Sequence, residues 1–114
     1  MKIQAVTICV SDFNKSKQFY EDVLGFQPDM YYEETKWQSY KCEEMAFFAI
    51  SETEDLRRRN SPDIINFVVH DVNQFWEAIK TKVKAEMEPT ETPWGTYKIV
   101  IFDPDGYRLG FIED

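Results

Sequence analysis

The chain has 114 residues, enough for one ordinary domain with a buried core. Lys and Arg number 13 against 21 Asp and Glu, so the formal net charge is −8, which argues against nucleic acid as a partner. Aromatic residues make up 16% of the chain, which argues against disorder, and no apolar run reaches the length of a membrane span. Without a signal-like apolar segment or a Cys-x-x-Cys pair, the sequence indicates a cytoplasmic protein with Cys9 and Cys42 reduced.

The first half of the chain predicts a strand, a helix and three more strands. Residues 3–10 are rich in β-branched side chains and predict the first strand. Asp12 is the expected helix N-cap, the apolar stripe of the helix ends at Leu24, and Gly25 is a natural stop. The three further strands are predicted at about 27–34, 36–42 and 45–51.

The second half repeats this order at an offset of 59 residues. Residues 64–69 predict a strand, and Asp71 with Gln74 three positions later forms a capping-box pattern before a second helix. On that helix, Trp76 belongs to the apolar stripe and is expected in the core. Three strands are then predicted at about 85–90, 96–102 and 107–112.

The repeat predicts an α+β fold of one domain with two tandem β-α-β-β-β modules. The modules cover about 1–52 and 62–114, and residues from about 53 to 61 link them. An arginine-rich run in this link is expected to be a solvated loop. We expect curved mixed sheets around a concave pocket, where a ligand would bind.

Three stretches carry a family resemblance. They are Val10–Tyr20 with the following Val-Leu-Gly-Phe, then Pro-Trp-Gly at 93–95, and Phe-Asp-Pro-Asp-Gly-Tyr at 102–107. Together with the doubled plan they resemble the vicinal oxygen chelate superfamily, which includes glyoxalase I, extradiol dioxygenases, fosfomycin-resistance enzymes and bleomycin-binding proteins. The resemblance implies the fold, whereas members of this superfamily differ in chemistry.

The resemblance also implies where a metal ion would bind. Enzymes of this superfamily hold a divalent metal with His, Gln or Glu from the first and last strands of each half. Those positions map, within a residue or so, onto Ala5, Phe48, Ile64 and Gly110, none of which has a side-chain donor. His70, the single histidine, maps to a strand-to-helix corner. We therefore expect no metal site, no cofactor and no catalytic residue.

Aromatic and polar side chains are the remaining candidates for a binding site. Trp94 lies on a predicted loop between Pro and Gly and is expected to stack on a ligand. Asn66 shares a strand face with Ile64 and is expected to orient the ligand. The full predicted set of ligand-binding residues is Trp94, Phe48, Tyr97, Asn66, Trp37, Tyr40 and Arg108.

These features favour a metal-free small-molecule-binding protein, similar to the bleomycin-binding branch and expected to be a homodimer. It would sequester an aromatic or cationic drug or metabolite, as in antibiotic resistance, and the negative charge of the chain would attract a cation. One alternative is a glyoxalase- or dioxygenase-type enzyme, a lyase or an oxidoreductase. Another is a protein-interaction or regulatory module. No nucleic-acid or membrane partner is expected.

Overall fold

The computed structural model describes residues 1, 3–43, 46–55 and 61–114. The chain divides into two compact units, Met1–Arg57 and Arg58–Asp114, and the boundary falls within the predicted link. The arginine run predicted as a solvated loop lies outside the described residues. Each unit is described by itself below.

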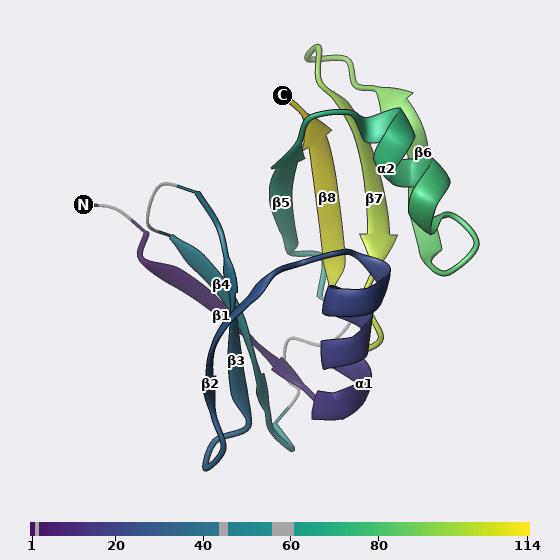
Figure 1. Ribbon diagram of the computed structural model, residues 1–114. Helices are drawn as coiled ribbons and strands as arrows, with labels where there is room; N and C mark the ends of the chain where they lie inside the picture. The colour runs from purple at the N-terminus through teal and green to yellow at the C-terminus, as the bar shows by residue number, and fades with distance from the viewer. Residues whose placement is uncertain (2, 44–45, 56–60) are drawn as a thin grey trace. The chain divides into compact units, whose positions relative to one another are not determined.

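The first unit contains one helix, which continues into a π-helical turn, and a four-stranded mixed sheet (Figure 1). In the sheet the order is β1-β4-β3-β2, with β1 and β4 parallel and the other pairs antiparallel. The elements are β1 (Ala5–Val10), α1 (Phe13–Gln18), η1 (Phe19–Val23), β2 (Pro28–Tyr32), β3 (Trp37–Lys41) and β4 (Phe47–Glu52).

The second unit repeats this topology with the sheet order β5-β8-β7-β6 and a parallel pair β5 and β8. Its elements are β5 (Ile64–Val69), α2 (Val72–Ile79), β6 (Lys84–Glu91), β7 (Tyr97–Phe102) and β8 (Arg108–Glu113). The predicted α+β fold with two β-α-β-β-β modules is therefore confirmed. In the part of the chain that the structure describes, no helix has the length and apolar character needed to span a membrane.

Each helix begins at the aspartate that the sequence predicts. The Asp12 side chain accepts a hydrogen bond from the backbone N–H of Lys15 at 3.1 Å. The Asp71 side chain accepts one from the backbone N–H of Gln74 at 2.9 Å. Both caps satisfy backbone donors that have no partner within the helix.

A second carboxylate reaches each helix start from the last strand of the same unit. Glu52 of β4 accepts a hydrogen bond from the backbone N–H of Phe13 at 2.9 Å. Glu113 of β8 accepts one from the backbone N–H of Val72 at 3.2 Å. A negative charge here is also favoured by the helix dipole, so these glutamates fix each helix to its own sheet.

The π-helical turn and the sheet enclose an aromatic core in the first unit. Tyr20 is fully buried, and its ring centroid lies 5.2 Å from that of Phe48 and 6.0 Å from that of Tyr40. Gly25 has φ +78° and ends the helical segment, as predicted. The sequence predicts a single helix up to Leu24, whereas the structure has a π-helical turn at Phe19–Val23. Tyr20, which packs against the sheet, lies in this turn.

The core of the second unit lies between α2 and its sheet. Phe111 of β8 is buried and contacts Phe75 of α2 at 4.6 Å between ring centroids and Phe67 of β5 at 5.3 Å. The fully buried residues of α2 are Val72 and Ile79. Trp76, predicted as a core residue, is only half-buried, and so is Phe75, although Phe75 contacts Phe111.

We predict that the strand-end glutamate stabilises the fold. Replacing Glu113 by Ala removes a charged acceptor from the start of α2 and should lower the free energy of unfolding by about 1 kcal/mol. The matched control, Glu77→Ala, removes an exposed carboxylate from the same helix and should change it by less than about 0.5 kcal/mol. Urea unfolding measures both variants, and equal effects would contradict the assigned cap.

Candidate functional site

The second sheet presents a helix-free face, which is the face opposite α2. Strand pairing determines which side chains lie on it, because directly paired residues point to the same side and successive residues alternate. It is formed by Ile64, Asn66 and Val68 of β5, by Arg108, Gly110 and Ile112 of β8, and by Lys98, Val100 and Phe102 of β7. The confirmed strand alternation places Asn66 and Ile64 together, as predicted.

Asn66 and Gly110 form the centre of this face. They are paired across β5 and β8, and Asn66 Oδ1 occupies the space beside Gly110 where a side chain would start. A Cβ added to Gly110 would lie 2.1 Å from that oxygen, which is far inside van der Waals contact. Val100 of β7 flanks Gly110 on the other side. The floor of the site is therefore small and apolar, with one amide above it.

Lys98 supplies the cation nearest to this amide. Its side chain is only 9% exposed, and its Nζ donates to Asn66 Oδ1 at 3.4 Å. Lys98 starts from β7 opposite Ile112 of β8, so its side chain extends diagonally across the sheet to reach Asn66. The placement brings an ammonium group and an amide together over the apolar floor.

An ion pair between Arg108 and Glu86 lies on the same face, beside a hollow. Arg108 donates to the two carboxylate oxygens of Glu86 at 3.0 and 2.6 Å and to the carbonyl oxygen of Pro62 at 2.5 Å. These hydrogen bonds lower the pKa of the Glu86 carboxyl and raise the pKa of Arg108. The hollow has a volume of about 320 Å³ and is lined by Ser61, Pro62, Glu86, Phe102, Gly106 and Arg108.

The helix-free face of the first sheet has a different character. It carries a row of rings in which Trp37 of β3 lies between Tyr32 of β2 and Phe47 of β4. The ring centroid of Trp37 is 5.6 Å from that of Tyr32 and 5.8 Å from that of Phe47. These are ordinary distances for interacting aromatic pairs. Trp37 is the one residue of the predicted binding set on this face.

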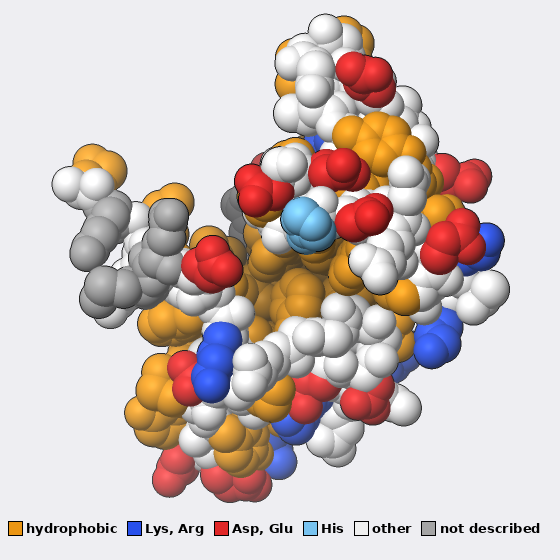
Figure 2. Space-filling view, turned by 45° about the horizontal axis from the view of Figure 1, so that its top comes forward, with side chains coloured by type: hydrophobic (Ala, Val, Ile, Leu, Met, Phe, Trp, Pro, Cys, Tyr) orange, Lys and Arg blue, Asp and Glu red, His pale blue; other side chains and the backbone are white. Residues whose placement is uncertain are grey.

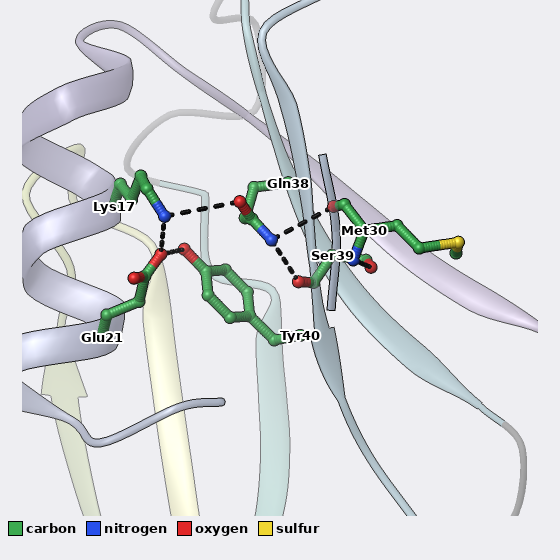
Figure 3. Close-up of polar contacts among 6 residues, drawn as sticks. All are labelled: Lys17, Glu21, Met30, Gln38, Ser39 and Tyr40. Atoms are coloured by element: carbon green, nitrogen blue, oxygen red, sulfur yellow. Dashed lines mark hydrogen bonds and ion pairs between the residues drawn. The ribbon is translucent and has the colours of Figure 1, made fainter. Parts of the chain in front are cut away.

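Three residues of the predicted binding set lie on the helix-covered faces instead. Phe48 packs against Tyr20, as described above. Tyr40 is fully buried, and Figure 3 shows its hydroxyl pointing to Glu21 of η1, to which it donates at 3.0 Å. Tyr97 donates from its hydroxyl to Asn73 of α2 at 2.7 Å. The three rings predicted to bind the ligand therefore pack toward the helical segment of their own unit.

The polar contacts around Tyr40 continue into the first helix. Lys17 of α1 forms an ion pair with Glu21 and donates to the buried Gln38 at 3.4 Å (Figure 3). Burial and the neighbouring Glu21 carboxylate raise the pKa of the Tyr40 phenol. Because the Gln38 amide also donates to the carbonyl oxygens of Met30 and Ser39, this network holds the helix on the sheet and is structural.

Trp94 lies on a rigid turn between β6 and β7, where the sequence places it. The turn is closed by hydrogen bonds between Thr92 and Thr96, including a contact of 2.7 Å between their hydroxyl oxygens. Gly95 adopts φ +91°, which favours glycine. The indole of Trp94 is 73% exposed. Its predicted role in stacking on a ligand stays a prediction.

The metal site that the family resemblance implies does not fit this chain. Ala5 of β1 pairs with Phe47 of β4, so Phe47 rather than Phe48 stands on its face. Ile64 offers no donor, and the space at Gly110 is taken by the Asn66 amide. Within the described residues, no group of three or more His, Cys, Asp or Glu side chains could hold a metal ion. We therefore derive no chemistry through a metal.

The remaining polar surface is dispersed. On the face drawn in Figure 2, acidic side chains lie among hydrophobic and neutral ones, and the single histidine, His70, is at the surface.

Sequence reasoning identified Asn66 and Arg108 but missed Lys98 and Glu86. The sequence does point to Lys98 in one way. It lies within the apolar strand of residues 97–102, where a charge without a partner is unfavourable.

Comparisons with known proteins agree with this architecture. The sequence profile of the Glyoxalase/Bleomycin resistance protein/Dioxygenase superfamily matches residues 2–111. The uncharacterized protein YraH of Bacillus subtilis (strain 168) is 30% identical over an alignment of 118 positions that covers 92% of each chain.

Two solved structures show the same fold. A protein of unknown function from Agrobacterium tumefaciens str. C58 has a TM-score of 0.84 at 23% identity, and the match covers 100% of this chain and 94% of that one. The fosfomycin resistance protein FosX of Listeria monocytogenes has a TM-score of 0.79 at 19% identity, with coverage of 97% and 90%.

We predict that Gly110 is required because of Asn66. Gly110→Ala should push the Asn66 amide away and lower the free energy of unfolding by about 1 to 3 kcal/mol, the usual cost of overpacking. In an Asn66→Ala background the same substitution should cost much less, because the clashing oxygen is gone. Urea unfolding of the four proteins gives this coupling, and an equal loss in both backgrounds would contradict the geometry.

We also predict a pH dependence from the Glu86 and Arg108 pair. The pKa of folded Glu86 lies below its ordinary value of 4.5. The pair therefore stabilises the fold above that value and loses this effect as the pH falls through the folded pKa. In Glu86→Gln, the free energy of unfolding should fall less steeply below about pH 4.5 than in the wild type, whereas parallel profiles would argue against the pair.

Proposed function

The chain belongs to the Glyoxalase/Bleomycin resistance protein/Dioxygenase superfamily, and we propose that it is a small-molecule-binding protein that holds its ligand without a metal ion. The superfamily name covers both enzymes and binding proteins, so the choice between them depends on the residues of this chain. The proposed binding surface is the helix-free face of the second sheet around Asn66.

One observation carries this proposal. At the place where the family resemblance would put a metal ligand, the chain has Gly110, and the Asn66 amide fills the space beside it. Two other ligand positions are Ala5 and Ile64, which are apolar. A divalent cation prefers several oxygen, nitrogen or sulfur ligands, whereas a small organic molecule prefers an apolar surface with a few placed polar groups. The arrangement supports the second kind of occupant.

The ring of Phe102 supports a ligand with a ring, because it lies on the same face of the second sheet as Arg108 and lines the hollow beside it. Stacking between aromatic groups contributes about 0.5–1.5 kcal/mol beyond burial of area. We therefore propose an aromatic drug or metabolite as the ligand, in line with the expectation from the sequence.

FosX offers a comparison for the biological role. It is a fosfomycin resistance protein that shares the fold of this chain. Sequestration of a toxic small molecule would need binding and no turnover, so it is compatible with apolar residues at the mapped ligand positions. We propose binding of this kind as the role of the chain.

Binding of a neutral aromatic probe tests the proposal. We predict that 1-naphthalenemethanol binds saturably in isothermal titration calorimetry with EDTA present. Asn66→Ala should weaken this binding about fivefold, the effect of one hydrogen bond of about 1 kcal/mol. The matched control Asn73→Ala removes an amide from α2, on the opposite face, and should leave the affinity unchanged.

Two outcomes would contradict the proposed function. One is the absence of saturable binding by the probe. The other is binding or turnover that appears only after Zn²⁺, Ni²⁺ or Mn²⁺ is added and disappears with EDTA, since this result would restore the glyoxalase- or dioxygenase-type enzyme.

A further inference from the structure

We propose that the ligand carries a carboxylate group and that Lys98, assisted by Asn66, binds this group. The inference rests on the proposed function and names the chemical class of ligand for the same site. It comes from the burial of Lys98, from the other charges on the helix-free face of the second sheet, and from the shape of its floor.

Lys98 is buried beyond what its contacts explain. Its side chain is 9% exposed, and an ammonium group has three N–H donors. The contact with Asn66 Oδ1 is 3.4 Å long, at the far end of the hydrogen-bond range. A buried ammonium is costly unless a negative group accepts its protons. A carboxylate on the ligand would supply that acceptor.

Glu86, whose carboxylate interacts with the charge of Lys98, already accepts hydrogen bonds from Arg108. Both carboxylate oxygens of Glu86 accept hydrogen bonds from Arg108, so Glu86 interacts with Lys98 through its charge rather than through a close contact. Farther along β6, Glu88 is exposed. Arg108 is therefore occupied by Glu86, whereas the buried Lys98 retains N–H donors for a ligand.

The local charge also favours an anion. Lys84, Lys98 and Arg108 share this face with Glu86, and Lys84 lies 5.8 Å from the ring centroid of Phe102. The face thus carries an excess of basic groups on a chain whose net charge is −8. The net charge of the chain led us to expect a cationic ligand. The basic groups on this face would repel a cation and attract an anion.

The geometry selects a carboxylate over a phosphate. A phosphate is best recognised by a two-pronged arginine, but the guanidinium of Arg108 is occupied by Glu86. A single ammonium and the NH₂ group of the Asn66 amide match the two oxygens of one carboxylate. Gly110 and Val100 beneath them provide an apolar floor for the carbon skeleton of the ligand.

A matched series of naphthalene probes tests the charge of the ligand. Isothermal titration calorimetry would compare 1-naphthoate, 1-naphthalenemethanol, 1-naphthylmethylammonium and 1-naphthyl phosphate. We expect 1-naphthoate to bind the wild-type protein at least tenfold more tightly than each of the other three. The neutral alcohol reports on the proposed function and the carboxylate on this inference.

Variants of Lys98 assign the effect to one side chain. Lys98→Met should weaken binding of 1-naphthoate by a larger factor than binding of the alcohol and so remove the advantage of 1-naphthoate, whereas Lys98→Arg should keep most of the advantage. The control Lys82→Met removes an exposed charge from the turn before β6 and should keep all of it. Circular dichroism spectra that match the wild type would show that each variant is folded.

The outcomes separate the two proposals. If no probe binds, the proposed function fails, and this inference fails with it. If the alcohol binds as tightly as 1-naphthoate, or the ammonium probe binds most tightly, the proposed function stands and the carboxylate is wrong. An equal loss for all probes in Lys98→Met would show a structural role and overturn the inference. If Lys98→Met does not fold, the wild-type series with Lys98→Arg still decides.

Discussion

The hydrogen bonds at the two helix starts determine which surfaces of this protein are available for binding. In each unit a carboxylate at the end of the last strand, Glu52 or Glu113, accepts from the first backbone N–H of the helix. The helix is thereby held on one face of its sheet. Because side chains alternate along a strand, this attachment buries every second residue and leaves the others on the helix-free face. The location of Asn66 and Lys98 follows from that constraint.

Much of the fold could be predicted from the sequence because its signals are local. The N-caps Asp12 and Asp71, the stop at Gly25 and the repeated strand pattern are all decided within a few residues. The strand-end glutamates could not be foreseen in the same way. Each glutamate is about 40 residues away in the sequence from the N–H that it accepts from, and only the folded sheet brings it to the helix.

The residues of the binding site were predicted less accurately than the fold, because the register of strand pairing decides which face a side chain lies on. A shift of one residue moves a side chain to the opposite face of a strand. The parallel pairing sets Ala5 opposite Phe47, so Phe48 points into the core instead. Asn66 was placed correctly because its relation to Ile64 depends on alternation within one strand. Lys98 was missed because a single lysine is usually exposed, and its burial is a property of the folded sheet.

We propose above all that a small carboxylic acid binds the helix-free face of the second sheet without a metal ion. Nitrogen-15 NMR spectra recorded during titration with 1-naphthoate in EDTA test it directly. The largest shifts should occur at the backbone amides of Asn66, Lys98 and Gly110. Shifts confined to α2 or to the turn that carries Trp94, with those three amides unchanged, would contradict it.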